Sequence, residues 1–357
     1  MSTALIYFSA FAIAALVSSF GTPLVLRLAT HLGVIDETHD SRRVHEVPTP
    51  RIGGIAVFFG FALALFAVLG FALSSPYALF PSIAHLGVHQ KIEAMSDQFD
   101  DIHRLVGLLF GSMLILGVGI WDDILTMRPR SKLLAQIVVA LISMLYGFII
   151  PGITNPFSHG AATSWIDFPM YVSIPLTLLW YVGMMNAINF IDGLDGLLAG
   201  FAAISSIFLF AIAVVHGSPV VALVVIALAG ASIGFLPYNF NPAKIFLGDA
   251  GSLFIGYVFA TVSIIGASKT AIAISIVVPV VVLALPILDT AAAIFRRAKA
   301  GKRITEADRG HFHHQLIFRF GLNVRQAVLL IYGVCFVLGI FALAVSTQFV
   351  HVFRHAL

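Results

Sequence analysis

The residues of this chain best suited to chemistry are aspartates that come in pairs or repeat at short intervals. Asp122 and Asp123 are adjacent. Neighbouring carboxylates raise one another's pKa unless a cation or metal compensates, so the pair is a candidate general base or metal ligand. Two solvated acids that cap a loop and pair with Arg128 and Arg130 explain the pattern equally well.

A second set of polar side chains lies in NAINFIDGLDG at 186–196. Asn186, Asn189, Asp192 and Asp195 recur every three residues and would share roughly one face of a local helix. The glycine after each aspartate permits close approach by a ligand. Helix capping would explain Asp195 alone, so the repeat favours a binding site.

A third candidate is FNPAKIFLGDAGS at 240–252. Asp249 stands between glycines where a helix is expected to begin. It suits Mg²⁺, which takes one or two protein carboxylates and leaves other positions to water and phosphate; a helix cap is the alternative. Phe246 offers a face on which a base could stack, or it packs at the membrane interface.

The segment 295–325 is rich in Lys and Arg, and it also contains three histidines, His311, His313 and His314. A charge run of this kind is usually a solvated or headgroup-facing surface. The histidines could bind Zn²⁺, but no cysteine is near and the guanidinium groups disfavour a cation, so an anion such as diphosphate fits better. In the loop 27–54, prolines stiffen the chain and Gly53-Gly54 permits tight packing.

The composition indicates what must position these groups. Of 357 residues, 59% are hydrophobic and 10% are charged, against about 45–50% and 25% in soluble domains. This excludes an ordinary soluble protein and argues against disorder and nucleic-acid binding. The only cysteine, Cys335, can form no intrachain disulfide.

Ten uncharged apolar runs are long enough to cross a bilayer, and they predict an all-α polytopic membrane protein of one domain, 1–357. The expected spans are 4–26, 53–73, 105–121, 133–150, 169–188, 197–215, 219–236, 252–268, 270–288 and 327–350.

Charge distribution predicts the orientation. With both termini outside, all but four of the 20 Lys and Arg residues face the cytoplasm, the exceptions being Lys91, Arg104, Lys269 and Arg354. No Lys or Arg precedes Arg27, which argues against a cleaved signal peptide. All but five of the 17 Asp and Glu residues are expected on this cytoplasmic side as well. Because acidic residues contribute little to membrane topology, orientation alone does not explain their clustering, and they predict a polar site there. The segment 74–104 is expected to be an outer loop.

Five motifs in this order resemble the polyprenyl-phosphate N-acetylhexosamine-1-phosphate transferases, the superfamily that includes the phospho-N-acetylmuramoyl-pentapeptide transferases. They are VHEVPTPRIGG at 44–54, WDD at 121–123, NAINFIDGLDG, FNPAKIFLGDAGS and DRGHFHH at 308–314. The last loop is similar to the undecaprenyl-phosphate N-acetylglucosaminyl-1-phosphate branch. The pentapeptide branch has a PxHHH run and a lysine where Thr126 stands here.

The resemblance implies roles for individual residues. Asp249 would be the principal Mg²⁺ ligand, with Mn²⁺ as an alternative metal, and Asp122 and Asp123 would be catalytic, one of them as the base. Asn189 and Asp192 would support the site. The residues that would bind the uridine, the diphosphate or the N-acetylhexosamine are Asp195, Asn239, Phe246, Arg303, Arg309, His311, His313 and His314.

The implied reaction transfers N-acetylglucosamine 1-phosphate from UDP-N-acetylglucosamine to undecaprenyl phosphate at the cytoplasmic face of the inner or plasma membrane, and it begins a cell-envelope glycan such as teichoic acid or lipopolysaccharide. Direct attack by the lipid phosphate and a covalent aspartyl route both remain open. Another UDP-N-acetylhexosamine, or UDP-N-acetylmuramoyl-pentapeptide, is the alternative donor. A secondary transporter of an anionic solute is the rival class, but transporters place ionisable residues inside their spans. The oligomeric state stays open, a homodimer included.

Overall fold

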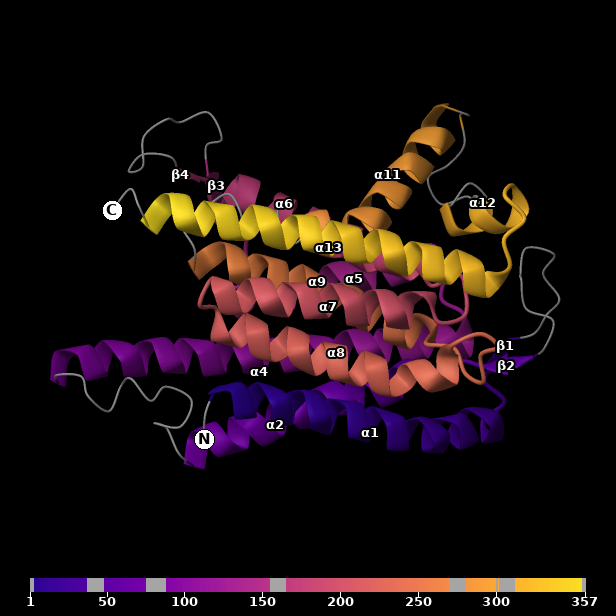
Figure 1. The fold of residues 1–357 in the computed structure, drawn as a ribbon, viewed down its shortest axis with the longest axis horizontal. Helices are drawn as coiled ribbons and strands as arrows, with labels where there is room; N and C mark the ends of the chain where they lie inside the picture. Colours follow the sequence, from indigo (N-terminus) through magenta and orange to yellow (C-terminus); the bar gives the residue numbers. More distant parts are fainter. Residues whose placement is uncertain are drawn as a thin grey trace.

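The structure is a computed structural model that describes residues 3–36, 48–74, 88–154, 165–269, 280–299, 301 and 312–354. Within these residues, eight helices are long and apolar enough to cross a membrane. They pack side by side as a bundle, with α11 leaning away from it (Figure 1). The eight are α1 (Thr3–His31), α2 (Gly54–Ser74), α4 (Val88–Leu125), α6 (Met170–Ile191), α7 (Leu197–Val215), α8 (Pro219–Asn239), α9 (Gly248–Lys269) and α13 (Val324–Arg354).

Shorter elements complete the described chain. They are the helices α5 (Pro129–Leu145), α11 (Ala284–Lys299) and α12 (Phe312–Phe318) and the strands β1 (Ile35–Asp36), β2 (Thr49–Pro50), β3 (Gly152–Thr154) and β4 (Trp165–Asp167). Strands β1 and β2 pair antiparallel, as do β3 and β4. The expected all-α polytopic fold is therefore confirmed, and the two short hairpins only join helices.

Two of the ten expected spans are not among the eight. The span expected at 133–150 corresponds to α5, which has 17 residues and ends at Leu145. Gly147 follows with φ 82°, a left-handed conformation that ends the helix. The span expected at 270–288 lies largely outside the described residues. The total of ten spans stays a prediction.

The expectation of an outer loop at 74–104 is wrong from Val88 onward. Residues 88–104 are helical and continue into α4, which has 38 residues and is about 57 Å long at 1.5 Å per residue. That length exceeds the roughly 30 Å of hydrocarbon in a bilayer. The sequence of 88–104 contains neither Gly nor Pro, so nothing in it breaks the helix, although its charges exclude it from an apolar span.

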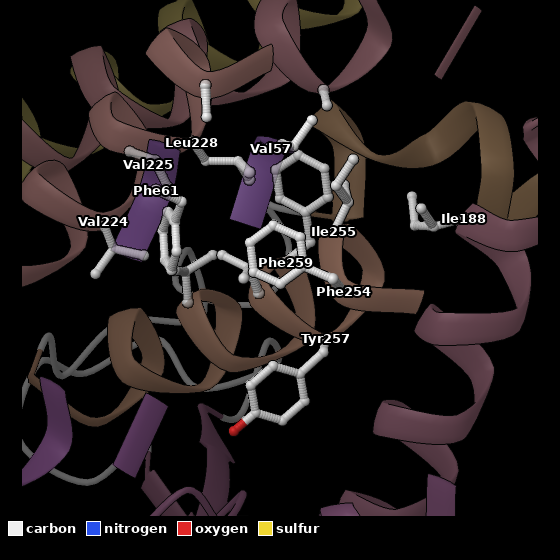
Figure 2. Packing of buried hydrophobic residues seen from close by; sticks show 14 of the residues in the cluster. Val57, Phe61, Ile188, Val224, Val225, Leu228, Phe254, Ile255, Tyr257 and Phe259 are labelled. Carbon is white, nitrogen blue, oxygen red and sulfur yellow. The ribbon is translucent and has the colours of Figure 1, made fainter. Parts of the chain in front are cut away.

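Helices α8 and α9 form the centre of the bundle, and their side chains are almost all buried. Phe254 packs edge-on against Phe58 and Phe61, with ring centroids 5.5 and 5.3 Å apart. Figure 2 shows Phe254 and Phe61 among the buried side chains around them. On α8, Gly230 and Gly234 lie against the backbone of α1. Small residues allow helices to approach closely where lipid provides no hydrophobic driving force.

One end of the bundle gathers the segments that carry the polar motifs. Helices α4, α6 and α8 end there, and α5, α7 and α9 begin there. Hairpin β1–β2, α12 and the start of α13 lie at this same end, while α1 begins and α13 ends toward the other (Figure 1). Which side of the membrane this end faces stays a prediction.

Candidate active site

Asp249, in the first turn of α9, lies at the centre of a polar cluster. Lys132 Nζ lies 2.5 Å from its Oδ2, and Asn189 Nδ2 donates to its Oδ1 at 2.5 Å. Asn189 also donates to Ser252 Oγ at 2.7 Å. Three helices, α5, α6 and α9, therefore converge on one carboxylate, whose side chain is still 26% exposed.

Lys132 also binds Asp122, the first aspartate of the adjacent pair. Its Nζ lies 2.9 Å from Asp122 Oδ2, while the backbone N–H of Met127 donates to Asp122 Oδ1 at 2.6 Å. Burial disfavours a charged amine, but the carboxylates of Asp249 and Asp122 outweigh it and raise the pKa of Lys132 above its usual value. Lys132 therefore stays protonated at neutral pH and holds the two carboxylates together.

Asp123 has a different task, because both of its oxygens cap α9. They accept the backbone N–H groups of Asp249 and Ala250, each at 3.0 Å. A carboxylate at a helix N-terminus satisfies otherwise unpaired donors and opposes the positive end of the dipole. Gly248 has φ 71° and leaves room for this contact, since a Cβ there would lie 2.5 Å from Asp123 Oδ2.

The loop 48–54 fastens the start of α2 to this cap. Arg51 donates to the carbonyl of Asp123 at 2.6 and 3.1 Å, and its Nη1 lies 3.7 Å from Asp36 Oδ1. Phe246 N donates to Pro50 O at 2.8 Å, and Gly53 N donates to Phe246 O at 2.8 Å. A Cβ on Gly54 would overlap the backbone of Gly251. The expected tight packing of the glycine pair is confirmed.

Asp195 and Asn239 organise the neighbouring loops. Asp195 Oδ2 accepts Asn241 Nδ2 at 2.9 Å and Ala243 N at 3.0 Å. Asn239 accepts Gly196 N at 3.2 Å and donates to Ile245 O at 2.9 Å. Both side chains are buried. They fix the segment that carries Phe246, whose role as a stacking surface, like their own contacts with uridine, stays a prediction.

The helical register expected for 186–195 holds only for its first part. Helix α6 ends at Ile191, and Asp192 forms its C-cap. Asn186 and Asn189 are helical, whereas Asp195 lies beyond the turn. Burial, together with the nearby carboxylates of Asp249, Asp123 and Asp195, raises the pKa of Asp192 well above its usual value. Burial and the neighbouring carboxylates thus favour the neutral form of Asp192.

The histidine motif reaches the same end of the bundle from α12. His313 is buried, and a Cβ on Gly193 would overlap its Nε2, so the histidine lies directly against Gly193, the residue that follows Asp192 in the sequence. His314 packs against it with ring centroids 4.3 Å apart. Nearby, the guanidinium of Arg297 lies 6.0 Å from the Phe190 ring centroid. The predicted residues Arg303, Arg309 and His311 lie outside the described residues.

Sequence reasoning did not identify Lys132 or Arg51 as residues of the site. A physical signal for Lys132 existed, because it falls in the first turn of a helix that begins with Pro129. A cation is disfavoured at a helix N-terminus unless carboxylates compensate. Arg51 gave a weaker signal, since it belongs to a motif whose prolines and glycines accounted for the loop structurally.

The donor set fits a hard divalent cation. Asp249 and Asp122 offer carboxylate oxygens, and the Lys132 ammonium already lies between them. Among the described residues, no three His, Cys, Asp or Glu side chains are arranged to hold a metal. Mg²⁺ commonly binds through only one or two carboxylates and retains several waters, and oxygen donors suit Mg²⁺ and Mn²⁺ alike.

Fold and site together define a polytopic membrane protein with a carboxylate, amide and ammonium cluster where its helices end. Comparison with known proteins gives the family. Residues 105–267 match glycosyl transferase family 4. The chain is 34% identical over 331 residues to a probable undecaprenyl-phosphate N-acetylglucosaminyl 1-phosphate transferase of Bacillus subtilis, covering 91% of this chain and 81% of the relative.

Two other relatives extend this comparison. A decaprenyl-phosphate N-acetylglucosaminephosphotransferase of Mycobacterium tuberculosis is 33% identical over 338 residues, covering 89% of this chain and 77% of the relative. A phospho-N-acetylmuramoyl-pentapeptide-transferase of Staphylococcus saprophyticus is 32% identical over 263 residues, covering 70% and 78%. The chain belongs to this family of polyprenyl-phosphate glycosyl-1-phosphate transferases, as its five motifs predicted.

Proposed function

We propose that this protein transfers N-acetylglucosamine 1-phosphate from UDP-N-acetylglucosamine to undecaprenyl phosphate, which gives undecaprenyl-diphospho-N-acetylglucosamine and UMP. The observation that carries the proposal is the convergence of Lys132, Asn189 and Asp122 around Asp249 at one end of a membrane bundle. The acceptor is a lipid whose phosphate lies at the membrane surface. The relatives named for this reaction with undecaprenyl and decaprenyl carriers support the choice of substrates.

The reaction exchanges one phosphorus–oxygen bond for another. An oxygen of the lipid phosphate attacks the phosphorus attached to the sugar, the bond from that phosphorus to the bridging oxygen breaks, and UMP leaves with the bonding electrons. The lipid phosphate is already largely ionised at neutral pH, so positioning and charge neutralisation contribute more than proton removal. Lys132 supplies a fixed positive charge beside the reacting groups.

Mg²⁺, or Mn²⁺ in its place, would be held by Asp249 and Asp122. When bound, it would neutralise negative charge on the diphosphate of the donor. The exposure of the Asp249 side chain, 26% against 9% for Asp122 and 3% for Asp123, supports Asp249 as the principal ligand. Asp123 would act through the α9 cap, because its side chain is only 3% exposed and both of its oxygens accept backbone N–H groups of that helix.

The same contacts favour direct attack over a covalent intermediate. A nucleophilic aspartate needs an oxygen that is free to approach phosphorus. Both oxygens of Asp123 accept backbone N–H groups, and those of Asp122 are engaged by Met127 and Lys132. The proposal therefore predicts no phosphorylated enzyme when the donor is supplied alone.

We place the active site on the cytoplasmic side of the plasma membrane. Arg51, Lys132, Lys244 and Arg325 all lie at the site end of the bundle, as the positive-inside rule requires for a cytoplasmic face. The diphosphate and sugar of the donor would bind toward His313 and His314, with Arg303, Arg309 and His311 completing that surface. The product would be the first membrane-bound intermediate of a cell-envelope glycan.

The decisive experiment uses the purified full-length protein in detergent or nanodiscs. It is incubated with undecaprenyl phosphate, Mg²⁺ and, in separate reactions, UDP-N-acetylglucosamine, UDP-N-acetylgalactosamine and UDP-N-acetylmuramoyl-pentapeptide, and the lipid product is identified by mass. We expect product with UDP-N-acetylglucosamine. If only UDP-N-acetylmuramoyl-pentapeptide gave product, the protein would be a phospho-N-acetylmuramoyl-pentapeptide transferase instead. Uptake of an anionic solute into vesicles, with no lipid product from any donor, would favour the transporter.

A further inference from the structure

A second amide contact lies one helical turn deeper in the bundle than the carboxylate cluster. Asn186 Nδ2 donates to Gln136 Oε1 at 2.7 Å and to Val182 O at 2.8 Å. Gln136 belongs to α5 and Asn186 to α6, so this contact joins the two helices that supply Lys132 and Asn189.

The spacing along each helix places this bridge directly beneath the active site. Gln136 follows Lys132 by four residues on α5, and Asn186 precedes Asn189 by three on α6. Residues three or four apart lie on the same face of a helix. The face of α5 that carries Lys132 and the face of α6 that carries Asn189 are therefore held together by the bond between Gln136 and Asn186.

Gln136 is fully buried, and its Nε2 has no hydrogen-bond partner among the described residues. A buried amide N–H without an acceptor is unfavourable. A methionine would fill a similar volume without that cost, so apolar packing does not require a glutamine here. What glutamine adds is a directional bond to Asn186, whose own NH₂ group is fixed because it donates to two acceptors.

We propose that Gln136 is a positioning residue for the transferase reaction, acting through Asn186 to set the separation of α5 and α6. Lys132 binds Oδ2 of Asp249 and Asn189 binds Oδ1. A shift of α5 relative to α6 would move one of these two groups off the carboxylate. Displacements of about 1 Å can slow catalysis by as much as about a hundredfold. This inference rests on the proposed function, because its effect is read from transferase turnover.

The test replaces Gln136 with methionine in the full-length protein. We expect Gln136→Met to lower kcat about tenfold and to leave the KM for UDP-N-acetylglucosamine within about twofold, because the donor-binding side chains are on other segments. The melting temperature in detergent and the stoichiometry of donor binding should match the wild type. Loss of donor stoichiometry in step with kcat would mean that the variant is partly unfolded, and would overturn a positioning role.

A double-mutant cycle tests whether Gln136 affects turnover through its hydrogen bond to Asn186. If Gln136 acts through Asn186, the variant Gln136→Met/Asn186→Leu should be no slower than the slower single variant. Losses that multiply to about a hundredfold would show two independent effects and overturn the inference. Tyr181→Phe is the matched control, because it removes a hydrogen bond of 2.9 Å between α6 and Thr261 of α9, away from the site.

The outcomes separate this inference from the proposed function. Tyr181→Phe should keep wild-type turnover, and an equal loss there would show that any polar contact between these helices has the same effect. A wild-type protein that makes no lipid product contradicts the proposed function. A wild-type protein that turns over, with Gln136→Met equally fast, contradicts the positioning role alone.

Discussion

The carboxylate of Asp123 accepts the backbone N–H of Asp249 at 3.0 Å, so the last turn of α4 caps the first turn of α9. The two aspartates are 126 residues apart in sequence. This single contact places the adjacent pair Asp122 and Asp123 beside the third carboxylate of the site. The two adjacent aspartates therefore have different partners. Asp123 accepts hydrogen bonds from the N-terminus of α9, whereas Asp122 forms an ion pair with Lys132.

Replacing Asp123 with asparagine should therefore affect folding more than replacing Asp122. Asparagine keeps one acceptor oxygen but presents an NH₂ group to the other backbone N–H of α9. We expect Asp123→Asn to destabilise the protein by about 1–3 kcal/mol and to abolish turnover. Asp122→Asn keeps an acceptor for Met127 N and should also be inactive but melt closer to the wild type. Thermal unfolding in detergent measures the difference, and identical melting temperatures would contradict the capping role.

The close approach of α4 to α9 depends on Gly119. A Cβ there would overlap the backbone of Asp249 and Ala250, whereas a Cβ on Gly117, two residues away on the same helix, meets nothing within 4 Å. We expect Gly119→Ala to cost about 1–3 kcal/mol and to separate the aspartate pair from Asp249. Gly117→Ala should be neutral or stabilising by up to about 1 kcal/mol. Melting temperature and UMP release should fall in the first variant only.

Hydropathy and motif spacing predicted the spanning helices and the segments that meet at one end. They did so because an uncharged run has few alternatives to a helix in lipid. The same reasoning missed the helix at 88–104, since a charged helix outside the membrane has no hydropathy signal. The spans were recoverable from local sequence because every backbone hydrogen bond in them is local.

Individual roles in the site were less predictable because they depend on contacts between distant segments. The convergence of Asn189 and Asp249 was expected. The sequence did not predict that Asp123 caps α9. No residue near Asp123 in the sequence indicates which distant helix its carboxylate would contact. Lys132 shows the same limit: its position in the first turn of α5 signalled a need for carboxylates, but only the fold identifies them as Asp122 and Asp249.

The charge of Lys132 should set the affinity of the site for a divalent cation. Its ammonium contacts both Asp122 and Asp249. Without it the two carboxylates attract a cation more strongly. We expect Lys132→Met to lower the Mg²⁺ concentration that half-saturates thermal stabilisation, while turnover falls at least about a hundredfold. Asp249→Asn should raise that concentration and abolish Mg²⁺-dependent UMP release from a folded protein.

A titration of melting temperature with Mg²⁺ tests these opposite shifts without relying on activity. Lys244→Met is the matched control, because Lys244 is an exposed lysine in the loop before α9 and its loss should leave the titration unchanged. If Lys132→Met and Asp249→Asn shift the midpoint in the same direction, Asp122 and Asp249 do not share a cation.

His313 should act on the donor rather than on the lipid. It is buried against Gly193, the residue that follows Asp192, on the side of the site formed by α12, whereas Lys132 and Asp122 lie on the side of α4 and α5. We expect His313→Ala to raise the KM for UDP-N-acetylglucosamine about tenfold, as the loss of one charge-assisted contact would. The KM for undecaprenyl phosphate should stay within about twofold, and membrane insertion should be unchanged.

His216 provides the matched control for the histidine variant. It lies at the opposite end of α7, where its Nε2 forms a hydrogen bond of 2.6 Å with Ser346 Oγ, so His216→Ala should leave both KM values unchanged. Initial rates measured across separate donor and acceptor series distinguish the two substrates. Equal KM values for His313→Ala and the wild type would make this histidine a packing residue of α12. An increase confined to the lipid series would place the acceptor phosphate, and not the donor diphosphate, beside Gly193.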